Sequence, residues 1–262
     1  MTIDIYQIDA FTKELFGGNP AAVCPLDSWL SDTTLLNIAK ENNLAETAYF
    51  VHKQDNIFHL RWFTPEIEMD LCGHATLASA FVIFNCLDYN LNNIKFKTSS
   101  GDLTVKREND LIVMDLPSRP PLPTNLPEII RTALSSPPVQ VFKSRDYVLV
   151  YNSQEDIANL KVNASVLNQI NIDRGGIIVT AKGATVDFVS RFFTPGAAVF
   201  EDPVTGSAHC SLVPFWAKQL HKYKLHAFQI SERKGELFCE IKEDRVIIKG
   251  NAVKYLKGKI TI

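Results

Sequence analysis

A short string that occurs twice, half a chain apart, constrains the fold of this sequence most. Residues 61–65 read Arg-Trp-Phe-Thr-Pro and residues 191–195 read Arg-Phe-Phe-Thr-Pro, in a chain of 262 residues. Each string is followed by a glycine that opens a run of small and apolar residues, at Gly73 and at Gly206. This repeat predicts a duplicated unit, each copy being a strand, a loop and a helix that begins at the glycine. Two copies are too few for a solenoid and indicate two similar domains.

The two runs that follow the glycines are apolar on nearly every side. Ala75–Phe84 carries no charged residue, and the run from Ser207 to about Leu220 is similar, with Pro214 expected to bend it. Helices without a polar face belong in a protein interior. We therefore expect an α+β fold of two similar halves, related by a pseudo-twofold axis, each a curved, mostly antiparallel sheet around a buried central helix. Both helix N-termini would point into the seam between the halves, where their N–H groups would bind an anion.

A change of composition marks the boundary between the halves. Seven of the thirteen prolines lie between positions 117 and 138, a density that regular elements do not tolerate. We expect a first half at residues 1–117, to which the C-terminal strand could add, and a proline-rich linker region at 118–140. A short helix is expected near Glu128, within that region. The second half would then occupy residues 141–262.

Charge and composition exclude several classes of function. A net charge of −2 without a dense run of Lys or Arg argues against a nucleic-acid partner. The chain opens in an alternating strand pattern and has no apolar stretch near ~18 residues, so we expect a cytoplasmic protein and no membrane partner. The five cysteines contain no Cys-x-x-Cys pair, and the histidines lack metal-ligand spacing, so we expect neither disulfides nor a metal site. No nucleotide-binding glycine motif is present.

Two residues in the first half could transfer protons. Glu46 has apolar flanks, Leu44–Ala45 and Ala48–Phe50, which would desolvate its carboxyl group and raise its pKa. An outward-facing residue or a salt-bridge partner would show the same pattern. His74 follows Gly73 at the start of the first buried helix, where an imidazole can bind a carboxylate, transfer a proton or serve only as a structural group.

The loop before the second helix adds further candidates. Asp202 could be a second acid or base, or could cap the turn before a proline. Ser207 could donate to an anion or act as a plain N-cap. Asp202, Ser207 and His209 lie too close in sequence for a nucleophile triad, and no Gly-x-Ser-x-Gly elbow occurs, which excludes a serine hydrolase. Cys72 lies just before a helix whose dipole would lower its thiol pKa, but we expect an inert, buried cysteine.

Several strings, in order along the chain, resemble the PhzF-like isomerases of phenazine biosynthesis. They are Asp9–Thr12 with Gly18–Val23, Asn43–Ala48, Arg61–Pro65, Cys72–Ala78 and Glu201–Ala208. The resemblance runs over nearly the whole chain and implies the diaminopimelate-epimerase-like fold of two similar halves. It also implies a cofactor-independent isomerase that moves a proton on a small cyclic or amino carboxylic acid, in a cleft between the halves, and that forms a homodimer.

The same resemblance implies roles for individual residues. The acid/base residues would be Glu46, His74 and Asp202, and the substrate-binding residues would be Gly73, Gly206, Ser207 and Asn19. In the related racemases two cysteines act as bases, one ahead of each helix. Here Cys72 matches the first position, but the second position has no thiol, which disfavours a two-thiol racemase. An amino-acid epimerase, and a protein that binds a small acid without turning it over, remain alternatives.

Overall fold

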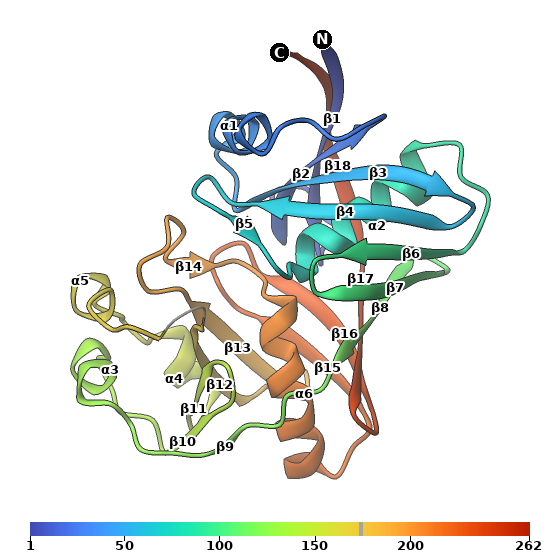
Figure 1. Cartoon of the computed structure of the whole chain (residues 1–262). Coiled ribbons are helices and arrows are strands. Elements are labelled where there is room, and N and C mark those ends of the chain that lie inside the picture. The colour runs from blue at the N-terminus through green and yellow to red at the C-terminus, as the bar shows by residue number, and fades with distance from the viewer. Residues whose placement is uncertain (173–174) are drawn as a thin grey trace. The chain divides into compact units, whose positions relative to one another are not determined.

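The computed structural model describes residues 1–172 and 175–262, and its chain divides into two compact units. Unit 1 comprises Met1–Leu116 and Ile247–Ile262, and unit 2 comprises Pro117–Val246. Figure 1 draws unit 1 in blue to green, with the red C-terminal strand added to it. The proline-rich stretch, expected to form part of a linker, belongs to unit 2.

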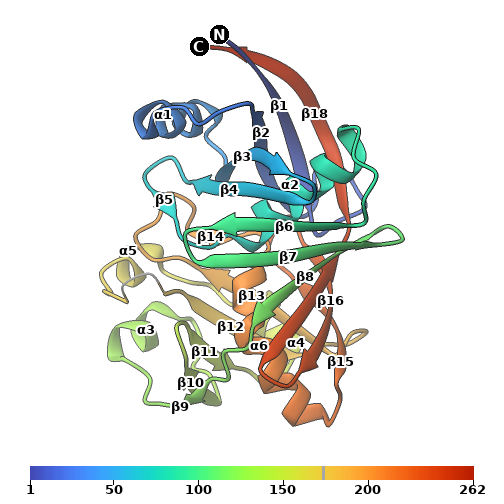
Figure 2. The ribbon, with the colours of Figure 1, turned by 45° about the vertical axis from the view of Figure 1, so that its right-hand side comes forward.

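Unit 1 contains a mixed sheet and two helices. Its elements are β1 (Thr2–Ala10), β2 (Asn19–Leu26), α1 (Asp32–Asn42), β3 (Glu46–Gln54), β4 (Ile57–Phe63), β5 (Glu68–Met69), α2 (Gly73–Cys86), β6 (Asn93–Thr98), β7 (Gly101–Glu108), β8 (Leu111–Pro117) and β18 (Ala252–Thr261). β1 pairs antiparallel with both β2 and β18, whereas β2 and β3 run parallel. Figures 1 and 2 both show α2 against β1, β2 and β3, with which it is in contact.

Unit 2 carries more short elements. They are β9 (Leu122–Pro123), α3 (Glu128–Ala133), β10 (Gln140–Lys143), β11 (Tyr147–Val150), α4 (Gln154–Ala158), α5 (Ala164–Leu167), β12 (Ile177–Lys182), β13 (Phe188–Phe193), β14 (Glu201–Asp202), α6 (Gly206–Leu220), β15 (Lys224–Gln229) and β16 (Gly235–Lys242); β17 (Arg245–Gly250) continues into unit 1. The helices α4 and α5 are short, and Val162 between them forms a β-bridge with Leu134.

The same set of strand pairings occurs in both units. β4 pairs antiparallel with β3 and β5 and parallel with β6. β13 pairs antiparallel with β12 and β14 and parallel with β15. In the chain, α2 lies between β5 and β6, and α6 lies between β14 and β15. The repeated string in the sequence thus corresponds to a strand topology that occurs in both units. Gly73 begins α2, and Gly206 begins α6.

The arginine of each repeated string ties a two-residue strand to its neighbour. Arg61 of β4 binds both carboxylate oxygens of Glu68 on β5, each at 2.7 Å. Arg191 of β13 binds both carboxylate oxygens of Glu201 on β14, each at 2.8 Å. Each guanidinium also lies over the phenylalanine two positions later, at 5.1 and 5.0 Å from the ring centroid. Forked charge-assisted bonds with ring stacking are arrangements that arginine makes and lysine does not.

Both glycine-led helices are buried, as their apolar sequences predict. Eleven of the fourteen residues of α2 are buried, which leaves it no face for water. Nine of the fifteen residues of α6 are buried, and Pro214 lies inside this helix. No helix in residues 1–172 and 175–262 combines the length and the apolar content that crossing a membrane requires.

His209 is a fully buried polar residue of α6. Its Nδ1 donates to the carbonyl oxygen of Thr205 at 2.9 Å, and its ring lies 5.8 Å from that of Phe188. Its Nε2 is buried, and no partner for this atom lies among the residues that the structure describes. Burial lowers the pKa of His209 to about 4, so the ring is neutral in the folded protein at neutral pH.

The two repeated arginines should differ in their contribution to stability. Arg191 also donates to the carbonyl oxygens of Ile157 and Leu160, at 3.0 and 2.9 Å, whereas the further partner of Arg61 is an exposed aspartate. We expect Arg191→Lys to lower the free energy of unfolding by about 2 kcal/mol and Arg61→Lys by about 1 kcal/mol or less. Urea unfolding of both variants checks this ranking, and the reverse ranking would contradict it.

His209 should make the protein less stable in acid. Its pKa falls from 6.5 to about 4 on folding, so between these pH values the unfolded chain binds a proton that the folded chain excludes. The buried ring of His209 should leave the free energy of unfolding unchanged above pH 6.5 and should lower it by about 3 kcal/mol at about pH 4. His209→Gln cannot titrate and should lose correspondingly less stability over this range. Urea unfolding at several pH values measures the difference, and equal losses in both proteins would refute the assignment.

Candidate active site

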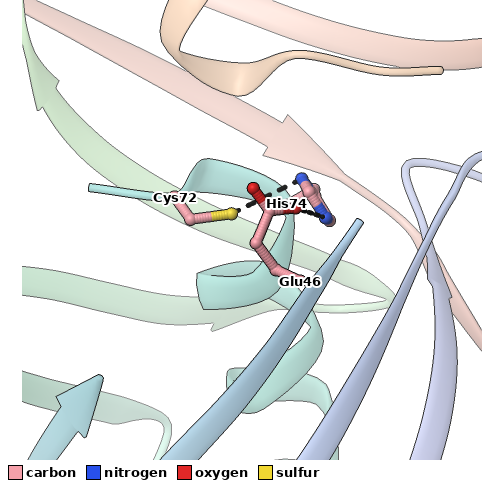
Figure 3. Close-up of side chains that lie close together, drawn as sticks. All are labelled: Glu46, Cys72 and His74. Carbon is pink, nitrogen blue, oxygen red and sulfur yellow. Dashed lines mark hydrogen bonds and ion pairs between the residues drawn. The ribbon is translucent and has the colours of Figure 1, made fainter. Parts of the chain in front are cut away.

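Glu46 and His74 meet in unit 1, at the starts of two elements. Glu46 is the first residue of β3, and His74 is the second residue of α2. Nε2 of His74 lies 3.0 Å from Oε2 of Glu46. Figure 3 draws this contact as a dashed line. This is the separation of an ion pair, although its alignment falls outside hydrogen-bond limits. The His74 side chain is 4% exposed and the Glu46 side chain 15% exposed, so solvent reaches the carboxylate more readily than the ring.

The other ring nitrogen of His74 has two neighbours. Nδ2 of Asn19 lies 3.1 Å from Nδ1, and Sγ of Cys72 lies 3.5 Å from the same atom. Asn19 begins β2 and is fully buried, and Cys72 is the N-cap residue of α2. Cys72 is buried as expected, but its contact with His74 was not predicted.

Local structure explains why these residues gather. β2 and β3 run parallel with Ala21 opposite Glu46, so the two strands begin at the same end. Asn19 lies two residues before Ala21, and side chains two apart on a strand share a face. Because α2 packs on both strands and begins at Gly73, its first turn brings His74 to that end of the sheet.

Burial and neighbouring charges act in opposite directions on His74. Burial opposes a charge on the ring, but the interactions of the ring with the Cys72 sulfur and the Glu46 carboxylate outweigh burial and raise the pKa of His74 well above its ordinary value. The pKa of Cys72 is itself raised to about 11, by burial and then by the Glu46 charge. The expectation that the helix dipole would lower the thiol pKa is therefore wrong, because burial is the larger effect. At neutral pH the thiol is protonated, and Glu46 is the carboxylate that favours a charged ring.

Glu46, Cys72 and His74 also have the spacing of a possible metal site. Their ligand atoms lie within 4.8 Å of one another, and carboxylate, thiolate and imidazole are zinc ligands. In this structure, however, Glu46 faces one ring nitrogen of His74 and Asn19 faces the other. A metal ion would have to displace one of these contacts. The expected lack of a metal site stays a prediction.

In unit 2, Asp202 belongs to a hydrogen-bonded group that precedes α6. The hydroxyl of Thr205 donates to Oδ2 of Asp202. Gln229, which is fully buried at the end of β15, accepts from the Thr205 backbone N–H at 2.8 Å and donates to the Asp202 carbonyl at 2.7 Å. These bonds fix the loop that carries Asp202. Gln229 was missed from sequence, although a polar residue in a buried alternating strand is a signal for such a role.

Ser207, the second residue of α6, has an arginine partner. Nη2 of Arg145 donates to Oγ of Ser207 at 3.1 Å. The same guanidinium contacts both oxygens of Asp146, which is 1% exposed, at 3.2 and 3.3 Å. No local pattern in the sequence indicates Arg145 as a partner of Ser207, because the two residues lie 62 positions apart in the chain.

The predicted site residues therefore fall into two groups, each within one unit. Unit 1 brings together Glu46, His74, Gly73 and Asn19. Unit 2 contains Asp202, Gly206 and Ser207 around the start of α6.

Comparisons with known proteins agree with this architecture. The family model of the phenazine biosynthesis-like proteins, PhzC-PhzF, matches residues 8–258. An uncharacterised isomerase of Pseudomonas aeruginosa is 46% identical over 260 residues, which cover 99% of each chain. The crystal structure of a PhzF family protein from Enterococcus faecalis matches with a TM-score of 0.95 and 43% identity over 100% of both chains.

A more distant structure shares the fold alone. A hydroxyproline epimerase from Agrobacterium vitis matches with a TM-score of 0.61 at 6% identity, over 99% of this chain and 92% of that one. The predicted α+β, diaminopimelate-epimerase-like fold is thus confirmed. The match over nearly all residues and the close relatives show that the chain belongs to the PhzC-PhzF family of phenazine biosynthesis-like proteins.

Proposed function

We propose that this protein is a PhzF-like isomerase that moves a proton on a small cyclic or amino carboxylic acid without a cofactor. The observation that carries the proposal is the contact between Glu46 and His74 at the start of a buried helix. Two titratable groups in contact, one nearly buried and one partly open to solvent, suit general acid/base chemistry. The relative in Pseudomonas aeruginosa is named as an isomerase, which supports the same class.

In the proposed reaction, Glu46 removes a proton from a carbon atom of the acid. The C–H bond breaks, its electron pair moves into the adjoining unsaturated system, and the proton passes to a carboxylate oxygen of Glu46. Glu46, which is partly open to solvent, exchanges its proton with water and then returns a proton to a different carbon atom, so the reaction is balanced without an oxidant or reductant. His74, at 3.0 Å from one oxygen of Glu46, orients the carboxylate and stabilises its negative charge.

Anionic oxygen atoms of the substrate would bind at the helix starts that carry the proposed site residues. The backbone N–H groups of Gly73 and His74 belong to the first turn of α2, where the helix carries partial positive charge. Asp202, Gly206 and Ser207 are assigned to the same reaction because the string Glu201–Ala208 resembles the family. On the same resemblance we propose a homodimer. We propose a cytoplasmic location because the sequence has no long apolar stretch.

Cys72 is not the base in this proposal. With its pKa raised to about 11, the thiol holds its proton at neutral pH, and a protonated thiol cannot remove a proton from carbon. Its sulfur faces the ring of His74. A hydroxyl in its place could make the same contact.

Substitution of Glu46 should abolish exchange of substrate hydrogen with solvent. Glu46→Gln keeps the shape of the side chain but removes the proton acceptor, and should lower the rate about 10²–10⁴-fold. Cys72→Ser should change the rate little. The measurement is deuterium incorporation from heavy water, followed by NMR, into a panel that includes a dihydro-hydroxyanthranilic acid and hydroxyproline. Glu41→Gln, at an exposed glutamate of α1, is the matched control.

Two results would replace the proposal. Loss of exchange in Cys72→Ser with normal exchange in Glu46→Gln would indicate a one-thiol epimerase. Binding of an acid by the wild-type protein without any exchange would indicate a small-acid-binding protein.

The carboxylate of Asp202 should also be required. Asp202→Asn keeps an acceptor for the Thr205 hydroxyl but removes the charge and the proton-binding site. We expect the exchange rate to fall about 10²-fold or more, with little loss of stability. Asp244→Asn, at an exposed aspartate of unit 2, should behave as wild type. An unchanged rate in Asp202→Asn would limit that residue to capping its turn.

A further inference from the structure

Arg145 lies on a tight turn that is fixed to its surroundings at several points. The turn joins β10 to β11, where Lys143 pairs with Tyr147. Ser144 and Ser211, a residue of α6, are joined by a hydrogen bond of 2.8 Å between their hydroxyls. Asp146 accepts the backbone N–H of Gly176 at 2.8 Å. The turn that carries Arg145 is therefore held to α6 by the Ser144–Ser211 bond and to Gly176 by the Asp146 bond, and Arg145 itself makes neither.

A glycine permits a further close approach to this turn. A Cβ atom on Gly175 would lie 2.6 Å from the carbonyl oxygen of Arg145, a separation that real Cβ atoms do not show. The backbone at Arg145 is thus packed closely on the segment before β12. This packing fixes the direction in which the side chain leaves the turn.

In the hydrogen bond between Arg145 and Ser207, the donor and the acceptor can be assigned. A guanidinium group has only donors, so Oγ of Ser207 must accept from Nη2 of Arg145. A hydroxyl that accepts with one lone pair keeps its own hydrogen for another acceptor. Asp146 contacts the same guanidinium with both carboxylate oxygens and so partly offsets its charge. The main effect of Arg145 on Ser207 is therefore to orient the hydroxyl group, and the net positive charge of Arg145 contributes less.

We propose that Arg145 is a positioning residue: it orients the Ser207 hydroxyl so that the hydroxyl donates to an anion at the start of α6. The inference deepens the proposed function, on which it rests for the identity of that anion, a carboxylate of the substrate. The hydroxyl, the N–H groups of the first turn and the positive end of a fifteen-residue helix then act on the same ligand. The buried Asp146 supports the arrangement by holding the guanidinium in place.

A double-mutant cycle with an anion probe tests this role without a known substrate. Inorganic sulfate is titrated into the full chain, and the backbone N–H signals of Gly206 and Ser207 are followed by NMR. We expect Ser207→Ala and Arg145→Met each to weaken binding about 3–10-fold, as loss of one hydrogen bond does. In the Ser207→Ala background, Arg145→Met should have almost no further effect. Arg145→Lys, which keeps a donor, should restore part of the affinity.

A matched control separates this role from general charge and from folding. Arg131→Met removes an arginine of unit 2 that is paired with Glu128 on the surface, and it should leave sulfate binding unchanged. Each variant is also unfolded in urea, because a purely structural role would change stability without coupling to Ser207.

Three outcomes overturn the proposal. The first is that sulfate leaves the signals at the start of α6 unchanged in the wild-type protein. The second is that Arg145→Met has no effect, and the third is that it weakens binding equally with and without the Ser207 hydroxyl. Coupling between the two residues together with absent proton exchange would retain this inference and reject the isomerase.

Discussion

Burial of two helices that have no polar face is the constraint on which the rest of the structure depends. α2 and α6 are rich in small and apolar residues, so leaving them exposed to water would be costly. In unit 1, α2 packs on β1, β2 and β3, and in unit 2, α6 packs on β15 and β16. Burying a helix also buries its first turn, whose N–H groups and polar side chains then need partners. The candidate site residues of each unit lie at such a buried helix start.

The histidines near these two starts show how local partners decide ionisation. His74 and His209 are both buried, which by itself disfavours a charged ring. His74 has the Glu46 carboxylate at 3.0 Å, and the pKa of its ring is raised. His209 has no carboxylate partner among the residues that the structure describes, since its ring bonds to the Thr205 carbonyl, and burial lowers its pKa to about 4. One ring is therefore suited to proton transfer, and the other is a neutral part of the core.

The repeated strings make the same contacts in both units, whereas the candidate site residues differ between the copies. Arg61 and Arg191 make equivalent contacts to a glutamate and to a phenylalanine, and neither arginine contacts the proposed acid/base residues. Ahead of the helices the two copies diverge. One has Cys72 as the N-cap residue, and the other has Thr205, which is bonded to Asp202. A duplicated scaffold thus carries two different sets of side chains.

The sequence by itself determined the repeat, the two buried helices, the main strands and the choice of Glu46 and His74 as candidate acid/base residues. These features are readable because apolar periodicity, the glycines at helix starts and the family's strings are local properties of the chain. Local patterns do not predict the strands β5 and β14, because a strand of two residues is too short to show alternation of apolar and polar side chains. They also failed for the proline-rich stretch, whose folding into unit 2 depends on contacts with distant residues.

Only the tertiary structure decided the contacts that define the site. Gln229 lies 24 residues from Thr205, and Arg145 lies 62 residues from Ser207. Such pairs depend on strand register and on how a helix packs on its sheet, and no single segment encodes either. The pKa of Cys72 depends on tertiary structure in the same way, because the dipole that lowers it is local, whereas the burial that raises it comes from the whole unit.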